Sequence, residues 1–293
     1  MVFLTIINEQ SKTSIFYTFI MPEGPETHRM ADRIHKSLID KKILKFKFQH
    51  KSLLELNRLE KISVIDVLSV GKAVVIRLDN GLSIISHNQL YGKWTFNRPK
   101  TIIKSNRQLR IEFLTKSIAV RLWSATDIKL FLTKDESMHP YIEKIGPDVL
   151  HETTSIDCII RMLEGKAFNR SLSSVLLDQS VISGLGNYLR SEILFFGSLI
   201  HTQKISELSQ TQRIKLAKCI KEVSVRAYIQ KGKTIDLNYF DKEFGNKENF
   251  KRVRHMVFSR EGLPCFICGN LILKQIVSAR RIFLCPCCQN LKE

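Results

Sequence analysis

The spacing of apolar residues changes twice along the chain, and each change indicates a different kind of structure. Apolar residues first recur at every fourth position from Met30 to Leu38, with charged residues between them, which predicts an amphipathic helix. Pro25 suits the first turn of this helix, where its missing N–H costs nothing, and Glu23 suits the positive helix end. The regular structure therefore opens with a well-started helix.

Between residues 44 and 123 the apolar period shortens to two, which is typical of strands with one buried face. Asp79, Asn80 and Gly81 separate two of these runs and are a strong hairpin signal. The expected strands cover 44–48, 61–69, 73–78, 82–86, 91–96, 108–114 and 118–123. We therefore expect a β-sandwich with the first helix packed on it.

Beyond Gly146 the helical spacing returns, and the last long helix opens at Ser209 and Gln212 with a capping-box pattern. The expected helices cover 156–163, 172–176, 187–196 and 209–227. A charged connector over 242–254 then leads to a cysteine-rich end. The fold class is α+β. Its parts are an extension, 1–20, and three domains, 21–145, 146–250 and 251–293.

Basic residues exceed acidic ones by a wide margin and are spread over the whole length. The 293 residues include 46 Lys+Arg against 28 Asp+Glu, a formal net charge of +18, while the hydrophobic content of 44% is ordinary for a globular protein. A broad positive field favours a polyanionic partner, most simply nucleic acid. No stretch is a convincing membrane-spanning helix, so we expect no membrane partner.

Residues 1–20 do not fit the pattern of the rest. Polar residues 8–12 interrupt their two apolar runs and no basic residue precedes the first run, so they make a poor signal peptide or membrane anchor. A start codon placed upstream of the working one at Met21, or an extra edge segment, explains them better. Because the cysteines crowd near the C-terminus, which suits metal binding in a reducing compartment, we expect a cytoplasmic protein that is not secreted.

Translation from Met21 would give Pro22 a chemical role. Removal of the methionine would leave the secondary amine of Pro22 as the chain terminus, with a pKa near ~8, so that part of it is nucleophilic at neutral pH. Its attack on an aldehyde-level carbon gives an iminium that withdraws electrons from the neighbouring carbon, and Glu23 would stand within reach as a general acid or base. On these residues alone, a proline-containing helix start after a chance methionine is the simpler interpretation.

The strongest local signal is a cysteine quartet with zinc-ligand spacing, two Cys-x2-Cys pairs separated by sixteen residues. The four are Cys265, Cys268, Cys285 and Cys288. Four thiolates leave no open coordination position, so one structural Zn²⁺ is expected, with Cys287 as a competitor for Cys288. The hairpin between the pairs carries Arg280 and Arg281 at its tip, where they suit phosphate unless they are merely solvated. Free thiols without metal are the alternative.

Three loops carry weaker signals. The turn 184–187 ends in Asn187 at a helix start, which suits phosphate, although ordinary helix-to-helix turns look alike. Lys72 lies in a tight turn between two strands and could simply be exposed. The segment 86–94 places Gln89, Leu90 and Tyr91 at a strand end, which suits insertion into a base stack. Its alternative is a hairpin with Leu90 and Tyr91 in the sandwich core.

Taken in order, six stretches resemble the motifs of the Fpg/Nei DNA glycosylases, and most closely the endonuclease VIII branch. They are MPEGPE, VGKAVV, SHNQLYGKW, IGPDVL, LLDQSVISGLGNYLRSEIL and SARRIFLCPCCQ, between Met21 and Gln289. The resemblance implies an N-terminal catalytic β-sandwich, a helix-two-turns-helix domain and a C-terminal zinc ribbon. It also implies a bifunctional DNA glycosylase/AP lyase of base excision repair. Such an enzyme removes oxidised pyrimidines through an N-terminal proline Schiff base and β,δ-elimination.

The same resemblance implies roles for single residues. Pro22 would be the nucleophile that attacks C1′ of the sugar, and Glu23 the acid that protonates the sugar ring oxygen. Lys72 would contact the phosphate near the lesion and assist β-elimination. Arg280 would bind the lesion phosphates and support δ-elimination.

The implied DNA contacts come from three further places. Gln89, Leu90 and Tyr91 would fill the void left by the everted nucleotide, and Asn187 would contact phosphate. Lys144 stands where the family has an arginine that touches DNA, so the charge is kept but the bidentate fork is lost. The partner would be damaged double-stranded DNA, held by a monomer in the cytoplasm at the nucleoid.

Two alternatives within the family stay open. Gly24, where the formamidopyrimidine branch has a bulkier residue, favours oxidised pyrimidines, and a glycosylase acting on oxidised purines is the runner-up. If residues 1–20 stay attached, Pro22 is a tertiary amide without a nucleophilic nitrogen, which would leave a non-catalytic DNA-binding homologue. Outside the family, an RNA- or ribosome-associated zinc-ribbon protein has only charge and the quartet in its favour.

Overall fold

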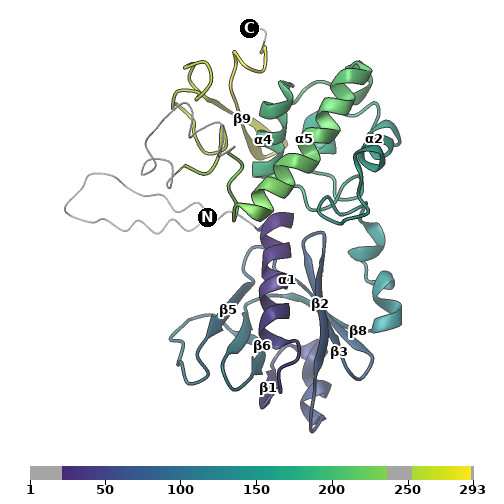
Figure 1. The fold of residues 1–293 in the computed structure, drawn as a ribbon, viewed down its shortest axis with the longest axis vertical. Coiled ribbons are helices and arrows are strands. Elements are labelled where there is room, and N and C mark those ends of the chain that lie inside the picture. The colour runs from purple at the N-terminus through teal and green to yellow at the C-terminus, as the bar shows by residue number, and fades with distance from the viewer. Residues whose placement is uncertain (1–21, 236–252, 292–293) are drawn as a thin grey trace, which may run out of the picture.

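The computed structural model describes residues 22–235 and 253–291, which form two lobes in contact along one helix (Figure 1). The lower lobe in that view holds α1 (Gly24–Leu38) and two four-stranded sheets, and the upper lobe holds the other helices and a two-stranded hairpin. Residues 1–20 and most of the charged connector expected over 242–254 lie outside the described residues. None of the described helices is long and apolar enough to cross a membrane.

The sheets of the lower lobe have the strand orders β1-β6-β7-β5 and β2-β3-β4-β8, with all neighbours antiparallel. The strands are β1 (Lys45–Phe48), β2 (Val64–Val70), β3 (Ala73–Leu78), β4 (Leu82–His87), β5 (Lys93–Asn97), β6 (Leu109–Leu114), β7 (Ala119–Trp123) and β8 (Asp127–Leu132). Short 3-10 helices cover Lys51–Arg58 (η1), Thr133–Met138 (η2) and Ile142–Lys144 (η3). The expected β-sandwich is confirmed.

The main core of the lower lobe lies between α1 and the sheets, with a smaller cluster around Ala73, Val75 and Ile85. Ile34 and Leu38 of α1 are fully buried in the main core together with Phe48 and Phe113, whose rings meet edge to face at 5.6 Å. The sequence prediction missed β8, although its apolar residues alternate. This strand pairs with β4 and completes the second sheet, so its absence from the prediction left that sheet one strand short.

The upper lobe is organised around α4, of which nine of eleven residues are buried. Its helices are α2 (Ile156–Glu164), α3 (Leu172–Val175), α4 (Asn187–Gly197), η4 (Ile205–Glu207) and α5 (Gln210–Ile229), and its hairpin is β9 (Leu273–Val277) with β10 (Arg280–Leu284). Ser278 and Ala279 take φ values of 50° and 60°, which are those of a two-residue hairpin turn that follows the twist of its strands. The capping box of α5 is confirmed.

A buried carboxylate on α4 attaches the cysteine-rich module to this lobe. Glu192 accepts hydrogen bonds from the backbone amides of Met256, Val257 and Phe258 at 2.8, 2.8 and 2.9 Å. The hydroxyl of Thr234 donates a fourth bond at 2.5 Å. Charge-assisted bonds to several backbone donors satisfy a buried carboxylate well, so the module is fixed to α4 and moves with it.

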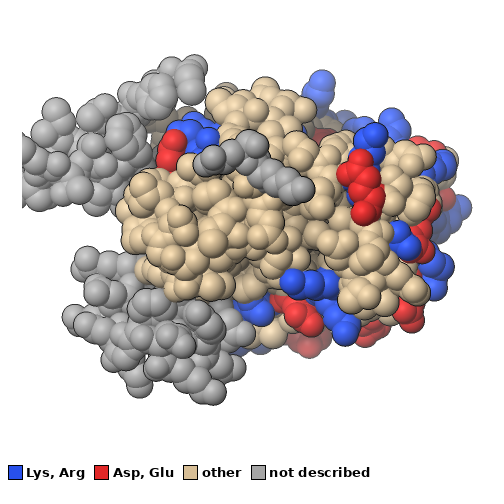
Figure 2. Space-filling view, turned by 90° about the horizontal axis from the view of Figure 1, so that it is seen from above, with Lys and Arg blue, Asp and Glu red and all other residues tan. Residues whose placement is uncertain are grey.

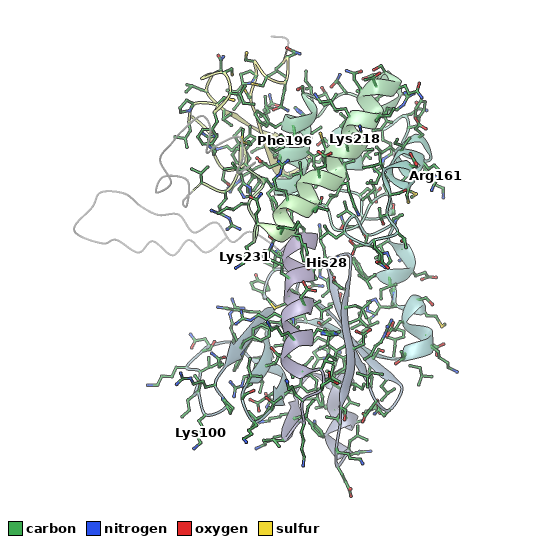
Figure 3. All side chains as sticks on the ribbon, in the orientation of Figure 1. His28, Lys100, Arg161, Phe196, Lys218 and Lys231 are labelled. Atoms are coloured by element: carbon green, nitrogen blue, oxygen red, sulfur yellow. The ribbon has the colours of Figure 1, made fainter. Side chains whose placement is uncertain are left out.

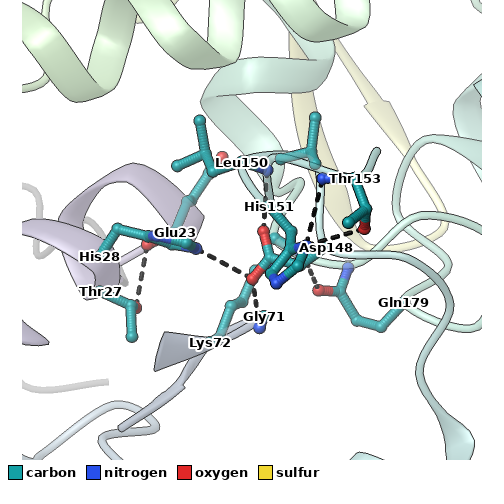
Figure 4. A network of polar contacts seen from close by, with 12 residues as sticks. Glu23, Thr27, His28, Gly71, Lys72, Asp148, Leu150, His151, Thr153 and Gln179 are labelled. Atoms are coloured by element: carbon teal, nitrogen blue, oxygen red, sulfur yellow. Dashed lines mark hydrogen bonds and ion pairs between the residues drawn. The ribbon is translucent and has the colours of Figure 1, made fainter. Parts of the chain in front are cut away.

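Asp148 joins the lobes from the segment that connects them. Its Oδ2 accepts a bond of 2.6 Å from the amide of Gly71 and lies 2.9 Å from Nε2 of His28, while its Oδ1 accepts from the amide of Leu150 at 2.9 Å (Figure 4). Figure 3 shows His28 at the junction, close to the lower end of α5. Asp148 thus connects α1, the turn between β2 and β3, and the start of the upper lobe.

A second junction ties α1 to the C-terminal end of α5. Nη1 of Arg29 donates to the carbonyls of Ala227 and Tyr228 at 2.7 and 3.3 Å, where a cation suits the negative end of the helix. The hydroxyl of Tyr228 donates to Oδ2 of Asp32 at 2.6 Å. The helix α1, whose N-cap is Glu23, is therefore held by both lobes.

Candidate active site and nucleic-acid interface

The carboxylate of Glu23 is buried at the junction between the lobes, at the N-terminal end of α1. Its Oε1 accepts a bond of 2.8 Å from the amide of Tyr188, and its Oε2 accepts one of 3.3 Å from the amide of Leu189. Both amides belong to the first turn of α4, whose positive end suits a carboxylate. Glu23 is only 3% exposed, and Pro22 precedes it directly, half-buried at the same place.

Three glycines make this approach possible. The amide of Gly24 donates to the carbonyl of Gly184 at 2.7 Å, and a Cβ on Gly24 would lie 2.9 Å from Cα of Gly184. A Cβ on Gly186 would lie 2.3 Å from Cδ of Glu23. The turn 184–187, which the sequence suggested as a phosphate site, is therefore also the surface that receives Glu23.

Lys72 reaches the same turn from the lower lobe. It follows Gly71, whose φ of +59° turns the chain between β2 and β3. The backbone amide of Lys72 donates to the hydroxyl of Tyr141 at 2.8 Å, and its Nζ donates to the carbonyl of Leu185. The ammonium group is thereby drawn out of solvent and over the start of α4.

Burial changes the chemistry of both groups. It raises the pKa of Glu23 to about 7, although Lys72 and the two α4 amides act in the opposite direction. Burial lowers the pKa of Lys72 from its usual value, opposed by the charge of Glu23 and assisted by that of Arg280. A carboxyl group with a raised pKa beside an amine with a lowered pKa is suited to proton transfer.

The upper lobe places hydrogen-bond donors of the kind that bind phosphate near Glu23 and Lys72. Arg280 begins β10, and its charge is close enough to help lower the pKa of Lys72 and, after burial, that of Arg190, which falls to about 10. Nη2 of Arg190 donates to Oδ1 of Asn187 at 2.8 Å and to the carbonyl of Arg281 at 3.0 Å. One buried guanidinium thus fixes both the Asn187 side chain and the hairpin that carries Arg280.

The segment with Gln89, Leu90 and Tyr91 is an exposed turn between β4 and β5. Leu90 is 51% and Tyr91 64% exposed, so the alternative that they fill the sandwich core is wrong. The amide of Gly92 donates to the carbonyl of Asn88 at 2.7 Å, which closes the turn, and β5 begins two residues later than the expected strand at 91–96. Two large apolar side chains are left free to enter a base stack.

Lys144 is exposed in η3, on the segment that connects the lobes. Its backbone amide donates to the carbonyl of Tyr141 at 3.3 Å. Seen from above the upper lobe, Lys and Arg lie at the edges of a mostly uncharged face (Figure 2). At the junction, positive charge near Glu23 comes from Lys72, and Arg280 lies close enough to Lys72 to affect its pKa.

The four cysteines of the quartet lie together as a group that could hold a metal ion. The four Sγ atoms lie within 4.8 Å of one another. Sγ of Cys265 lies 3.8 Å from that of Cys288, and Sγ of Cys268 lies 3.4 Å from that of Cys285, close to the ~3.8 Å that a tetrahedron of 2.3 Å bonds requires. Cys287, which the sequence left as a competitor for Cys288, is exposed and outside this group.

Two family models match most of the chain. That of the formamidopyrimidine-DNA glycosylase N-terminal domain matches residues 21–131, and that of the formamidopyrimidine-DNA glycosylase H2TH domain matches residues 145–238. Endonuclease 8 of Klebsiella pneumoniae subsp. pneumoniae is 35% identical over 272 residues, 92% of this chain and 100% of the relative. Endonuclease 8 of Salmonella arizonae is 34% identical over 272 residues with the same coverage. This chain belongs to the Fpg/Nei family of DNA glycosylases.

Solved structures of the family share its fold. Lactococcus lactis Fpg in complex with DNA containing an oxidised pyrimidine matches with a TM-score of 0.74 at 20% identity, over 92% of this chain and 99% of that one. The same protein bound non-covalently to AP-site DNA gives 0.73 at 19% identity, over 91% and 99%. The resemblance read from the motifs is confirmed, and the chain is a DNA glycosylase and AP lyase of base excision repair.

Sequence reasoning missed the residues that hold the site together. Gln179 donates from Nε2 to the carbonyl of Leu185 at 2.9 Å and accepts from the amide of Gly184 at 3.1 Å, so it fixes the turn that receives Glu23. Asp148 and Tyr141 do the same for the turn of Lys72. Asp148 and Gln179 lie within the IGPDVL and LLDQSVISGLGNYLRSEIL motifs, but the motifs do not show which atoms these side chains bond, and no local pattern distinguishes Tyr141.

Substitution of Gly186 by alanine should displace Glu23 without unfolding the lobe. Its backbone is extended, so alanine is not strained there, but the new Cβ would overlap the carboxylate. A shift of about 1 Å in a catalytic group costs roughly 10²-fold in rate. Single-turnover base release should fall by that order, while Gly165→Ala, at the end of α2 where contacts begin at 3.4 Å, should keep the parent rate. Equal rates for the two variants would contradict the role of the close contact.

The raised pKa of Glu23 predicts how base release depends on pH. The protonated form of Glu23 donates the proton, and its fraction falls above about pH 7 while the free-amine fraction of Pro22 still rises up to ~8, so the rate should level between these values and fall about tenfold per pH unit above ~8. Glu23→Gln should lower the rate by roughly 10²–10⁴-fold and abolish this limb. Glu26→Gln, one helical turn away, is the matched control and should retain it. Rate–pH profiles under single-turnover conditions check this, and an unchanged limb in Glu23→Gln would assign the proton to another group.

Proposed function

We propose that this protein excises oxidised pyrimidines from duplex DNA, with Pro22 as the nucleophile and Glu23 as the acid. The observation that carries the proposal is the burial of Glu23 beside Pro22 at the junction, where its pKa rises to about 7. Gly24 and the Gln89–Tyr91 segment favour the pyrimidine branch, as does the name Endonuclease 8 of the relatives. An oxidised purine substrate is the alternative within the family.

The chemistry begins with the free secondary amine of Pro22. Its lone pair forms a bond to C1′ while the bond from C1′ to the base breaks; the base leaves with that electron pair and takes up the proton that the Pro22 nitrogen loses. Glu23 gives its proton to the ring oxygen, the bond from C1′ to that oxygen breaks, and the lone pair regained by the nitrogen forms an iminium at C1′. Loss of the C2′ proton then expels the 3′ phosphate, and loss of the C4′ proton expels the 5′ phosphate.

Lys72, Arg280 and Asn187 act on the strand during these steps. Lys72 contacts the phosphate near the lesion, and the lowering of its pKa by burial favours its part in the proton transfers of β-elimination. Arg280 binds the lesion phosphates and supports δ-elimination with its planar donor fork. Asn187 adds its side-chain amide at the start of α4, where backbone N–H groups also favour phosphate.

A base inside a duplex must leave the stack before Pro22 can reach its sugar, at a cost of a few kcal/mol that is lower for a damaged base. Leu90 and Tyr91 are exposed enough to occupy the space it leaves, with Gln89 beside them. Lys144 contributes a phosphate contact from the segment between the lobes. We further propose that the enzyme acts as a monomer in the cytoplasm, on the DNA of the nucleoid.

The metal of the cysteine quartet is Zn²⁺ in this proposal, because four thiolates at this separation are its typical structural ligands. Bound there, it would hold the base of the hairpin whose tip carries Arg280. Backbone amides support the thiolates: those of Ile267 and Cys288 donate to Sγ of Cys265 and Cys285 at 3.4 and 3.5 Å.

The nucleophile is tested by comparing two forms of the protein. The form that begins at Pro22 should give a covalent adduct with a thymine-glycol duplex under borohydride, mapped to its N-terminal peptide. A form with residues 1–21 retained should give none, because its Pro22 nitrogen is a tertiary amide without a basic lone pair. An equal adduct in both would refute Pro22 as the nucleophile. An 8-oxoguanine duplex in the same assay decides between pyrimidine and purine substrates.

The metal assignment predicts one zinc per chain by elemental analysis. Cys268→Ser should bring the zinc content well below one and lower the affinity for duplex DNA, because the hairpin loses its fixed base. Cys287→Ser is the matched control and should keep one zinc, since Cys287 lies outside the quartet. Loss of zinc from Cys287→Ser alone would reassign the fourth ligand.

A further inference from the structure

The hydroxyl of Tyr141 contacts the turn of Lys72, and the proposed function gives this tyrosine no role. It accepts a hydrogen bond of 2.8 Å from the backbone amide of Lys72. A Cβ on Gly71 would lie 2.6 Å from the same oxygen, so the tyrosine is packed directly against the turn that carries the lysine. Tyr141 belongs to the segment between the lobes, immediately before η3, and is far from Lys72 in sequence.

The backbone amide of Lys72 has one partner among the described residues, this hydroxyl. The other anchors of the turn hold different atoms: Asp148 accepts from the amide of Gly71, and the Leu185 carbonyl accepts from Nζ of Lys72. Burial raises the pKa of Tyr141 to about 12, so the hydroxyl stays neutral through the working pH range. Removing its oxygen would leave a buried amide without an acceptor.

The ring of Tyr141 has a second contact, toward the exposed turn of Leu90. It meets the ring of His87 edge to face at 5.1 Å. Nδ1 of His87 accepts from the amide of Gln89 at 3.1 Å, at the start of that turn. Tyr141 therefore contacts two places. Its ring contacts His87, at the start of the segment Gln89–Tyr91 (the wedge), and its hydroxyl contacts the turn of Lys72.

We propose that Tyr141 is a positioning residue that sets Lys72 through its hydroxyl and the Gln89–Tyr91 wedge through its ring. This rests on the proposed roles of Lys72 and of the wedge. The hydroxyl fixes the backbone from which the Lys72 side chain extends to the start of α4. The ring packs against His87, so one side chain on the connecting segment positions both the wedge and Lys72.

Two variants separate the two contacts. Tyr141→Phe removes only the oxygen and keeps the ring, so it should slow strand cleavage at a pre-formed AP site roughly tenfold while its Kd for the duplex stays within about twofold of the parent. Tyr141→Leu removes the ring as well, so it should also raise the Kd for a lesion duplex. Tyr228→Phe is the matched control, because it too loses one hydroxyl bond between the lobes, to Asp32, away from Lys72.

The pH dependence distinguishes positioning from a loss of stability. In Tyr141→Phe the Lys72 side chain is less firmly held in its buried place, so its pKa should rise and the part of the cleavage–pH profile that Lys72 controls should move to higher pH. A merely structural role would lower the melting temperature and slow base release, adduct formation and cleavage equally, without moving this part of the profile.

Lys72→Gln shows which idea fails. If Lys72→Gln slows cleavage but Tyr141→Phe behaves like Tyr228→Phe in rate and pH profile, the positioning role of Tyr141 is wrong and that of Lys72 stands. If Lys72→Gln cleaves like the parent, the proposed role of Lys72 is wrong, and Tyr141 has no catalytic group to position. Base release and borohydride trapping by the parent report on Pro22 and Glu23 independently of both.

Discussion

The bond between the carboxylate of Glu23 and the first turn of α4 is the contact on which the rest of the site depends. It crosses from one lobe to the other, and it exists only because Gly186 leaves room for the carboxylate. The start of α1 and the turn before α4 are therefore positioned by the same contact. In the proposed mechanism, a DNA strand bound to the turn through phosphate is presented to the N-terminal end of α1, where Pro22 lies.

This arrangement lowers the stability of the protein above neutral pH. The folded state binds the proton of Glu23 more tightly than the unfolded state does, because burial raises the pKa from 4.5 to about 7. Stability from this group is therefore complete below pH 4.5 and is lost as the pH rises toward 7, by about 3 kcal/mol for a shift of this size. The amides of Tyr188 and Leu189 and the charge of Lys72 keep the loss from being larger. The protein gives up stability for an acid that is protonated near neutral pH.

The sequence was sufficient for what depends on local period and spacing. Apolar period predicted α1, most strands and the helices of the upper lobe, and cysteine spacing predicted the metal site, because those signals lie within short segments. It could not place Asp148 or Tyr141, whose partners are distant in sequence and set by the docking of the lobes. It also could not decide whether Leu90 and Tyr91 face the core or solvent, since the period does not specify where a strand ends and a turn begins.

The groups proposed to act on the sugar and its phosphates, among them Glu23, Lys72 and Arg280, come from separate parts of the chain. Only two units, the lower lobe and the upper lobe, have to be aligned to bring them together. Glu192 fixes the segment 256–258 to α4, and Arg190 fixes the hairpin that carries Arg280. The upper lobe therefore presents its hydrogen-bond donors for phosphate as one unit. The charges of Arg280 and Lys72 oppose each other in the protein alone, which contributes to the lowered pKa of the lysine. In the proposed mechanism a phosphate bound between them would relieve that repulsion and act to raise the pKa of Lys72. The proposed strand contact therefore favours the charged form of Lys72, and departure of the phosphate shifts the balance back toward the form that accepts a proton.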